Sequence, residues 1–252
     1  MRLTRVYVDT ALTPGSLIEL PPDTASHLAK VLRARSGDEL ILFNGDGREF
    51  NGAIEAVRGS RVSASVGDGR TVDRESPLAI TLVQCVPRGD RMDFIVQKAT
   101  ELGVARIVPV LSQRSVVRLD KAQAESKAIH WRAVAVSACE QCGRNRLPTI
   151  EVAQPLLNYL GASSPGTGPR LVFEPESTGH ARTAAPGAAE RAEAATVDAE
   201  IAIGPEGGFA SDELEAFRVA GFSQVGLGPR ILRTETAAIA AAVWLQARFG
   251  DM

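Results

Sequence analysis

The spacing of apolar residues changes at Pro77, and this change limits the folds open to the chain. Before it, short apolar runs separated by turn residues predict strands at 5–8, 16–20, 39–43, 49–57 and 61–66, with one helix near 23–34. After it, apolar strands alternate with amphipathic helices. The stretch 67–77 between them is polar and ends in proline. We therefore expect a small β-barrel domain at 1–70 and a second domain at 77–252.

The second domain has the pattern of an α/β fold. Strands are predicted at 78–83, 106–111, 170–173, 200–203 and 224–227, and helices at 91–102, 121–142, 212–220 and 234–249. Such alternation is typical of a mostly parallel sheet with helices on both faces. The Ala-, Gly- and Pro-rich stretch 176–199 is expected to be a partly helical or mobile surface insertion that carries no chemistry.

Composition excludes several classes of protein. The 252 residues are 44% hydrophobic, which is typical of a globular chain. The first ten residues lack the apolar region of a signal peptide, and no run reaches the roughly 18 apolar residues of a membrane span, so a cytoplasmic location without membrane attachment is expected. Three cysteines and three scattered histidines predict no disulfide framework and no metal site. Cys139 and Cys142 form a C-x-x-C late in a predicted helix, unlike a redox pair.

Charge is distributed unevenly along the chain. The net charge is −2, yet residues 75–150 contain eleven basic and seven acidic side chains. Of the 28 cationic side chains, 24 are arginine. Arginine suits planar, bidentate contacts with phosphates and bases, although GC-rich codon usage explains the excess equally well.

A first glycine-rich run, IGPEGGF at 203–209, follows a predicted strand and precedes a predicted helix. Ligands bind at the carboxyl edge of such sheets, and glycine lets the backbone approach them closely. The run is neither a P-loop nor a G-x-G-x-x-G motif, and Glu206 would repel a phosphate. It predicts either a ligand-binding loop or a tight strand-to-helix turn.

A second run, LGPRILRTET at 227–236, has the same position between a strand and a helix. It crowds Arg230, Arg233 and Glu235 beside an apolar Ile-Leu pair, and the helix that follows is rich in alanine. Small residues permit close helix packing. The charged residues indicate a functional loop or an exposed ion pair.

These two runs, with ATELGV at 99–104 and the Glu-Gln pair at 140–141, resemble the RsmE family of the SPOUT class. Residues Arg5, Val8, His27, 31–33, 37–38 and 44–45 are similar to the family's PUA-like RNA-binding barrel. The resemblance spans nearly the whole chain. It implies an α/β fold with a SPOUT-type knotted, mostly parallel sheet and a C-terminal trefoil knot, preceded by the PUA-like β-barrel.

The resemblance implies S-adenosyl-L-methionine as cofactor, bound among three loops near the C-terminus. Matched residue by residue, the predicted cofactor-binding positions are Phe173, Glu174, Gly204, Pro205, Glu206, Gly207, Gly208, Leu227, Gly228, Ile231, Leu232 and Thr236. The implied reaction is methylation of N3 of a uridine, uridine 1498, in 16S ribosomal RNA. Removing the N3 proton leaves negative charge on the ring oxygens, for which Arg230 and Arg233 are the candidate cations and Glu235 the candidate base.

The resemblance also implies partners. They are 16S ribosomal RNA, within the small ribosomal subunit, and a second copy of the chain. The predicted RNA-binding residues are Arg5, His27, Lys30, Arg33, Arg35, Arg88, Arg91 and Arg114. A SPOUT enzyme acting on another RNA nucleotide, a non-catalytic RNA-binding module, and an α/β enzyme for another adenine nucleotide stay open as alternatives.

Overall fold

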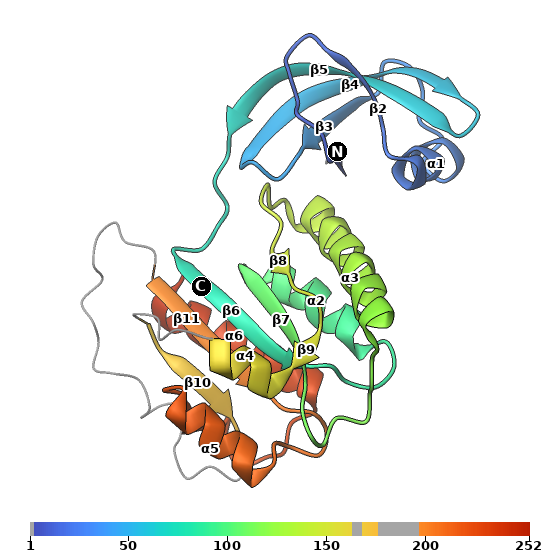
Figure 1. Cartoon of the computed structure of the whole chain (residues 1–252). Helices are drawn as coiled ribbons and strands as arrows, with labels where there is room; N and C mark the ends of the chain where they lie inside the picture. Colours follow the sequence, from blue (N-terminus) through green and yellow to red (C-terminus); the bar gives the residue numbers. More distant parts are fainter. Residues whose placement is uncertain (1–2, 163–167, 176–196) are drawn as a thin grey trace. The chain divides into compact units, whose positions relative to one another are not determined.

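The computed structural model describes residues 3–162, 168–175 and 197–252, and the chain divides into two compact units (Figure 1). The first unit comprises Met1–Glu75 and Val136–Leu147, and the second comprises Ser76–Ala135 and Pro148–Met252. The inclusion of 136–147 in the first unit was not expected from the sequence.

The first unit is built on a five-stranded sheet in the order β1-β3-β4-β5-β2. Its strands are β1 (Thr4–Tyr7), β2 (Leu17–Glu19), β3 (Glu39–Phe43), β4 (Arg48–Arg58) and β5 (Arg61–Thr71). β1 runs parallel to β3 and the other pairs are antiparallel. Two register shifts interrupt the long β4–β5 ladder, and such bulges bend a sheet. The bend lets one face wrap around an apolar core that includes Leu42, Phe50 and Val62.

Helix α1 (Pro22–Lys30) ends earlier than predicted. The reason lies at Arg33, whose φ of 52° places a non-glycine residue in the left-handed region. Backbone hydrogen bonds from Leu32 N to His27 O (3.2 Å) and from Ala34 N to Leu28 O (3.0 Å) close this turn. The turn leaves Val31 64% and Leu32 49% exposed.

A buried carboxylate joins the sheet to residues 136–147. Glu49 on β4 is 2% exposed and accepts hydrogen bonds from Arg5 (2.8 Å), Arg70 (2.8 Å) and Arg74 (3.0 Å). Arg5 also donates to Asn145 Oδ1 at 2.6 Å. Burial alone would raise the pKa of Glu49, but the three arginines outweigh it and lower this pKa to about 2. Glu49 is therefore an anion at neutral pH that holds strands β1, β4 and β5 to the loop after α3.

The second unit contains a parallel sheet of seven strands, in the order β12-β10-β11-β6-β7-β8 with β9 also paired to β7 (Figure 1). The strands are β6 (Leu78–Cys85), β7 (Arg106–Leu111), β8 (Thr149–Ile150), β9 (Gln154–Pro155), β10 (Arg170–Phe173), β11 (Val197–Ile203) and β12 (Ser223–Val225). The chain places β11 and β12 on opposite sides of β10. The carboxyl ends of β10, β11 and β12 therefore lie together.

Helices cover both faces of this sheet. One face packs against α2 (Arg91–Glu101), the first part of α3 (Lys121–Cys142) and α6 (Thr234–Phe249), around a core with Leu82, Trp131 and Leu245. The other packs against α4 (Leu156–Ala162) and α5 (Ser211–Val219), around Phe217 and Phe222. Ala238, Ala241 and Ala242 of α6 are buried, as expected for a helix packed closely on a sheet.

Most predicted elements of the second unit are confirmed, with the bounds of β7, α3, β10 and α6 as predicted. The short β8, β9 and α4 were not predicted. The prediction of an insertion at 176–199 is wrong for its last residues, because β11 begins at Val197. Residues 176–196 lie outside the described residues. Since they connect β10 to β11, the trefoil knot stays a prediction.

Candidate functional site

A cleft lies at the carboxyl edge of the sheet, where the chain leaves β10 and β11 and enters α6. Its volume is about 240 Å³, and we refer to it as the loop cleft. A side cavity of about 40 Å³ shares several of its walls. The loop cleft is lined by Phe173, Glu174, Pro175, Ile203, Gly204, Pro205, Glu206, Gly208, Ile231, Leu232, Arg233, Thr234 and Ala237. The side cavity adds Leu227, Gly228 and Arg230.

Two glycines in these loops are required by the backbone. Gly208 has a φ of 66° and closes a turn in which its N–H donates to the Pro205 carbonyl at 2.9 Å. Gly228 has a φ of 93° in the loop after β12. Residues with side chains rarely adopt such angles. The glycines therefore allow the backbone conformation of the loops, and they add no side chain to the walls of the loop cleft and the side cavity.

Side chains from distant segments hold the glycine-rich loop in place. The Thr234 hydroxyl donates to the Gly204 carbonyl at 2.8 Å, and Gln84 Nε2 donates to Thr234 Oγ1 at 2.9 Å. At the far end of the loop, buried Glu213 accepts from the Ala210 N–H at 2.9 Å and from the Gln113 N–H at 2.8 Å. The loop is thus fastened both to the sheet and to the segment after β7.

Two arginines contact the outer side of the same loop. Arg91, the first residue of α2, forms an ion pair with Glu206. Arg114 donates to the Gly207 carbonyl at 3.1 Å, and its side chain lies 3.5 Å from where a Cβ of Gly207 would be. Neither arginine lines the loop cleft, and both help to hold the loop in place from outside.

The structure brings most of the predicted cofactor-binding residues together. All of them line the loop cleft or the side cavity except Gly207, which contacts Arg114 instead, and Thr236, which is exposed on α6. Sequence reasoning missed Pro175, Ile203, Thr234 and Ala237. Thr234 could have been suggested by its place in the first turn of a helix beside a glycine-rich loop. Nothing local in the sequence signals Gln84.

The three predicted catalytic residues lie differently. Arg233 lines the loop cleft and Arg230 lines the side cavity. Glu235 lines neither, and its Oε2 is buried without a hydrogen-bond partner among the described residues. Successive residues of an α-helix are rotated by about 100°, so Glu235 points in a different direction from Thr234.

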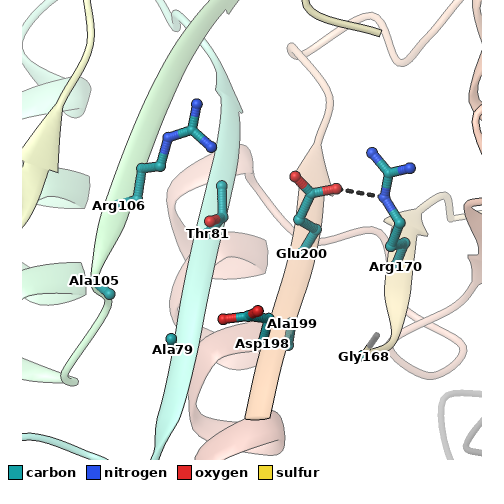
Figure 2. Close-up of a pocket in the computed structure, with 9 residues that line it drawn as sticks. All are labelled: Ala79, Thr81, Ala105, Arg106, Gly168, Arg170, Asp198, Ala199 and Glu200. Atoms are coloured by element: carbon teal, nitrogen blue, oxygen red, sulfur yellow. Dashed lines mark hydrogen bonds and ion pairs between the residues drawn. The ribbon is translucent and has the colours of Figure 1, made fainter. Parts of the chain in front are cut away.

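A second cavity, of about 360 Å³, lies at the opposite, amino edge of the sheet (Figure 2). Two of its arginines are already paired, since Arg170 forms an ion pair with Glu200 at 2.5 Å and Arg106 forms one with Glu151. Glu200 also accepts from the Tyr159 hydroxyl, and the pKa of Tyr159 is raised by burial and by this contact. The cavity has none of the glycine loops of the carboxyl edge, so we assign it no chemistry.

The predicted RNA-binding residues of the first unit separate into two groups. Arg5 is 9% exposed, and its guanidinium donates hydrogen bonds to Glu49 and Asn145 inside the unit. The prediction that Arg5 contacts RNA is therefore corrected: its guanidinium is buried and already bound. His27, Lys30, Arg33 and Arg35 are exposed on α1 and the turn after it. Among the described residues, no ion pair is formed by Lys30, Arg33 or Arg35.

The cysteines do not form a reactive site. Burial raises the pKa of Cys85, and contact with Cys142 together with burial raises the pKa of Cys139. A raised pKa keeps a thiol protonated and unreactive. In the part of the chain that the structure describes, three or more His, Cys, Asp or Glu side chains nowhere gather as metal ligands would. No helix among the described residues is long and apolar enough to cross a membrane.

Two family models match this chain. Residues 74–246 match the RNA methyltransferase domain, and residues 20–67 match the RNA methyltransferase PUA domain. The chain is therefore an RNA methyltransferase in which a SPOUT-type α/β domain follows a PUA-like domain, as the sequence predicted. It belongs to the ribosomal RNA small subunit methyltransferase E family. The relative from Buchnera aphidicola (Schizaphis graminum) is 33% identical, and the match covers 100% of this chain and 98% of the relative. The relative from Bacillus subtilis is 31% identical over 96% of this chain and 92% of its own.

Solved structures are similar over the full length. A methyltransferase from Legionella pneumophila in complex with S-adenosylmethionine is 38% identical, with a TM-score of 0.90 and 100% of both chains covered. A ribosomal RNA small subunit methyltransferase E from Neisseria gonorrhoeae bound to S-adenosyl methionine is 35% identical, with a TM-score of 0.86 and 100% of both chains covered. The RsmE family and the SPOUT-type fold predicted from the sequence are confirmed.

Proposed function

We propose that this chain transfers a methyl group from S-adenosyl-L-methionine to N3 of a uridine, uridine 1498, in 16S ribosomal RNA. The observation that carries the proposal is the loop cleft, formed by glycine-containing loops at the carboxyl edge of a parallel sheet in a chain of this family. Ligands of open α/β sheets bind at this edge.

The residues of the cleft fit such a cofactor. Ile203, Ile231 and Leu232 offer an apolar wall to an adenine ring, and Ile231 is 84% exposed although it lines the cleft. The carboxylates of Glu174 and Glu206 suit a cationic ligand. When bound, S-adenosylmethionine supplies an electrophilic methyl group on a positively charged sulfur. The loops around Gly204 and Gly228 hold the ligand and exclude water from one side.

Methylation of the target base requires stabilisation of negative charge and removal of a proton. We propose that Arg233 and Arg230, which line the two cavities, hold the negative charge that develops on the uracil oxygens as N3 loses its proton. Glu235 is the proposed base. Its Oε2 is buried with no hydrogen-bond partner among the described residues, so it is available to accept a proton.

The RNA is proposed to contact both units. On the first unit, Lys30, Arg33 and Arg35 present cations beside the exposed Val31 and Leu32. Phosphates pair with the cations, and unstacked bases cover the aliphatic side chains. His27 lies on α1 with Lys30. Arg88, Arg91 and Arg114 of the second unit complete the proposed set, and Arg91 and Arg114 contact the glycine-rich loop.

We further propose a cytoplasmic homodimer that acts on 16S ribosomal RNA within the small ribosomal subunit, with the PUA-like domain at 1–70 and the methyltransferase domain with its C-terminal knot at 77–252. The net charge of −2 supports a particle as substrate, because the chain as a whole is not attracted to naked RNA. Light scattering after size exclusion tests the dimer.

The cofactor class is tested by titration calorimetry with S-adenosylhomocysteine, ATP and NAD. We expect binding of the first alone. Binding of ATP or NAD instead indicates another adenine-nucleotide enzyme, and binding of none indicates a non-catalytic RNA-binding module.

A further inference from the structure

We infer that Gln84 and Thr234 are positioning residues that set the orientation of the Gly204–Pro205 peptide in the wall of the loop cleft. The inference rests on the proposed function and deepens it. It assigns to Gln84, which lies outside every cavity wall described above, a part in cofactor binding. Its basis is a chain of hydrogen bonds that runs in one direction through buried groups.

The peptide between Gly204 and Pro205 has a single group that can form a hydrogen bond. Proline has no N–H, so the Gly204 carbonyl is the only polar group through which this peptide can be hydrogen-bonded. That carbonyl accepts from the Thr234 hydroxyl at 2.8 Å. Gly204 has no side chain to restrain its own rotation. Among the described residues, the bond from Thr234 is the one that holds the Gly204 carbonyl in its orientation.

The direction of the Thr234 hydroxyl proton is determined by Gln84. Gln84 Nε2 lies 2.8 Å from the Cys85 carbonyl, which can only accept, so the amide nitrogen and not the oxygen must face that way. The same nitrogen donates to Thr234 Oγ1 at 2.9 Å. Because Thr234 Oγ1 accepts this bond, its own proton is directed to Gly204. Gln84 thus fixes the direction in which the Thr234 hydroxyl donates its hydrogen bond.

Gln84 occupies a buried position next to the loop, where its unpaired side-chain oxygen is energetically unfavourable. Gln84 pairs with Ile203 in the β6–β11 ladder, directly before Gly204. It is 0% exposed and Thr234 is 5% exposed, so water does not compete for these bonds. Gln84 Oε1 is buried without a partner among the described residues. A buried unpaired acceptor is costly, and an apolar residue would avoid the cost, which favours a functional reason for glutamine at this position.

The test uses the full-length protein and calorimetric titration with S-adenosylhomocysteine. Thr234→Val keeps the shape of the side chain and removes the hydroxyl, whereas Thr234→Ser keeps the hydroxyl. We expect Thr234→Val to weaken binding about tenfold and Thr234→Ser to bind within about twofold of wild type. Gln84→Leu is expected to weaken binding about three- to tenfold. The double variant should lose little more than Thr234→Val alone, because both changes break one chain of bonds.

Matched controls separate positioning from stability. Thr100→Val removes a buried hydroxyl that donates to the Val96 carbonyl within α2. Gln246→Leu removes a buried amide near the end of α6, which donates to the Leu102 carbonyl. Both lie away from the loop cleft, so they should lower the unfolding midpoint without changing affinity. Wild-type affinity in folded Thr234→Val, or equal losses in the controls, overturns the inference. Failure of the wild-type protein to bind S-adenosylhomocysteine overturns the proposed function instead.

Discussion

Replacing Glu49 by glutamine should destabilise the first unit, and acid should have the same effect on the wild-type chain. The carboxylate is 2% exposed, and its loss leaves Arg5, which is 9% exposed, without a counter-charge. The pKa of Glu49 is lowered from 4.5 to about 2 by arginines that outweigh its burial. Each pKa unit is worth ~1.4 kcal/mol, so the shift corresponds to about 3 kcal/mol. Because Arg70 and Arg74 are 66% and 40% exposed, solvent screening reduces the expected value to about 2 kcal/mol.

The sign of the pH dependence follows from the direction of the shift. A lowered pKa in the folded state adds stability that is fully present above the ordinary pKa of 4.5, and this stability is lost as the pH falls toward about 2. Both tryptophans, Trp131 and Trp244, belong to the second unit, so their fluorescence does not report on this change.

Hydrogen exchange read by mass spectrometry on peptides from β3 to β5 is the suitable assay. Protection factors, corrected for intrinsic rates, should fall about 30-fold in Glu49→Gln at neutral pH, and wild type should approach the variant as the pH falls to about 2. Glu55→Gln, an exposed change on the same strand, is the control. Equal protection in Glu49→Gln and Glu55→Gln would refute the reasoning.

Three further predictions concern the proposed activity. Gly228→Val forces a side chain into a φ of 93° and should abolish detectable S-adenosylhomocysteine binding in a folded protein; unchanged affinity by calorimetry would remove this loop from the site. Glu235→Gln should lower single-turnover methylation roughly 10²-fold while leaving cofactor affinity intact, and a near-normal rate with an unaltered pH profile would show that Glu235 is not the base. Joint replacement of Arg33 and Arg35 by alanine should weaken RNA binding and flatten its salt dependence by about 0.7–0.9 log units per lost phosphate contact. A wild-type salt slope on both free RNA and small subunits would contradict that role.

Long elements with clear end signals were predictable from the sequence, and short ones were not. The 22 residues of α3 and the 16 of α6 contain neither proline nor glycine, and a glycine, Gly143 or Gly250, directly follows each, so their bounds were predicted correctly. Strands β8 and β9 have two residues each, too few to show alternation. Helix α1 was predicted too long, since the left-handed conformation of Arg33 depends on hydrogen bonds that no local preference reveals.

The site was predictable as a set of loops but not as a set of contacts. The glycine runs identified the walls of the loop cleft because their spacing is local. The partnership of Gln84 with Thr234 joins residues 150 positions apart, and the burial of Arg5 depends on Glu49 and Asn145. Thr236 was chosen where Thr234 lines the cleft, because the direction of a side chain at a helix start depends on where the helix begins.

The most direct test of the central claim is the position of the methyl group on the product. Small ribosomal subunits that lack the modification are incubated with the protein and S-adenosylmethionine, and nuclease fragments of the 16S RNA are sequenced by mass spectrometry. We expect one 3-methyluridine per RNA, at uridine 1498, and none when S-adenosylmethionine is omitted. A methyl group on another nucleotide or another atom, or no transfer by a protein that binds S-adenosylhomocysteine, would contradict it.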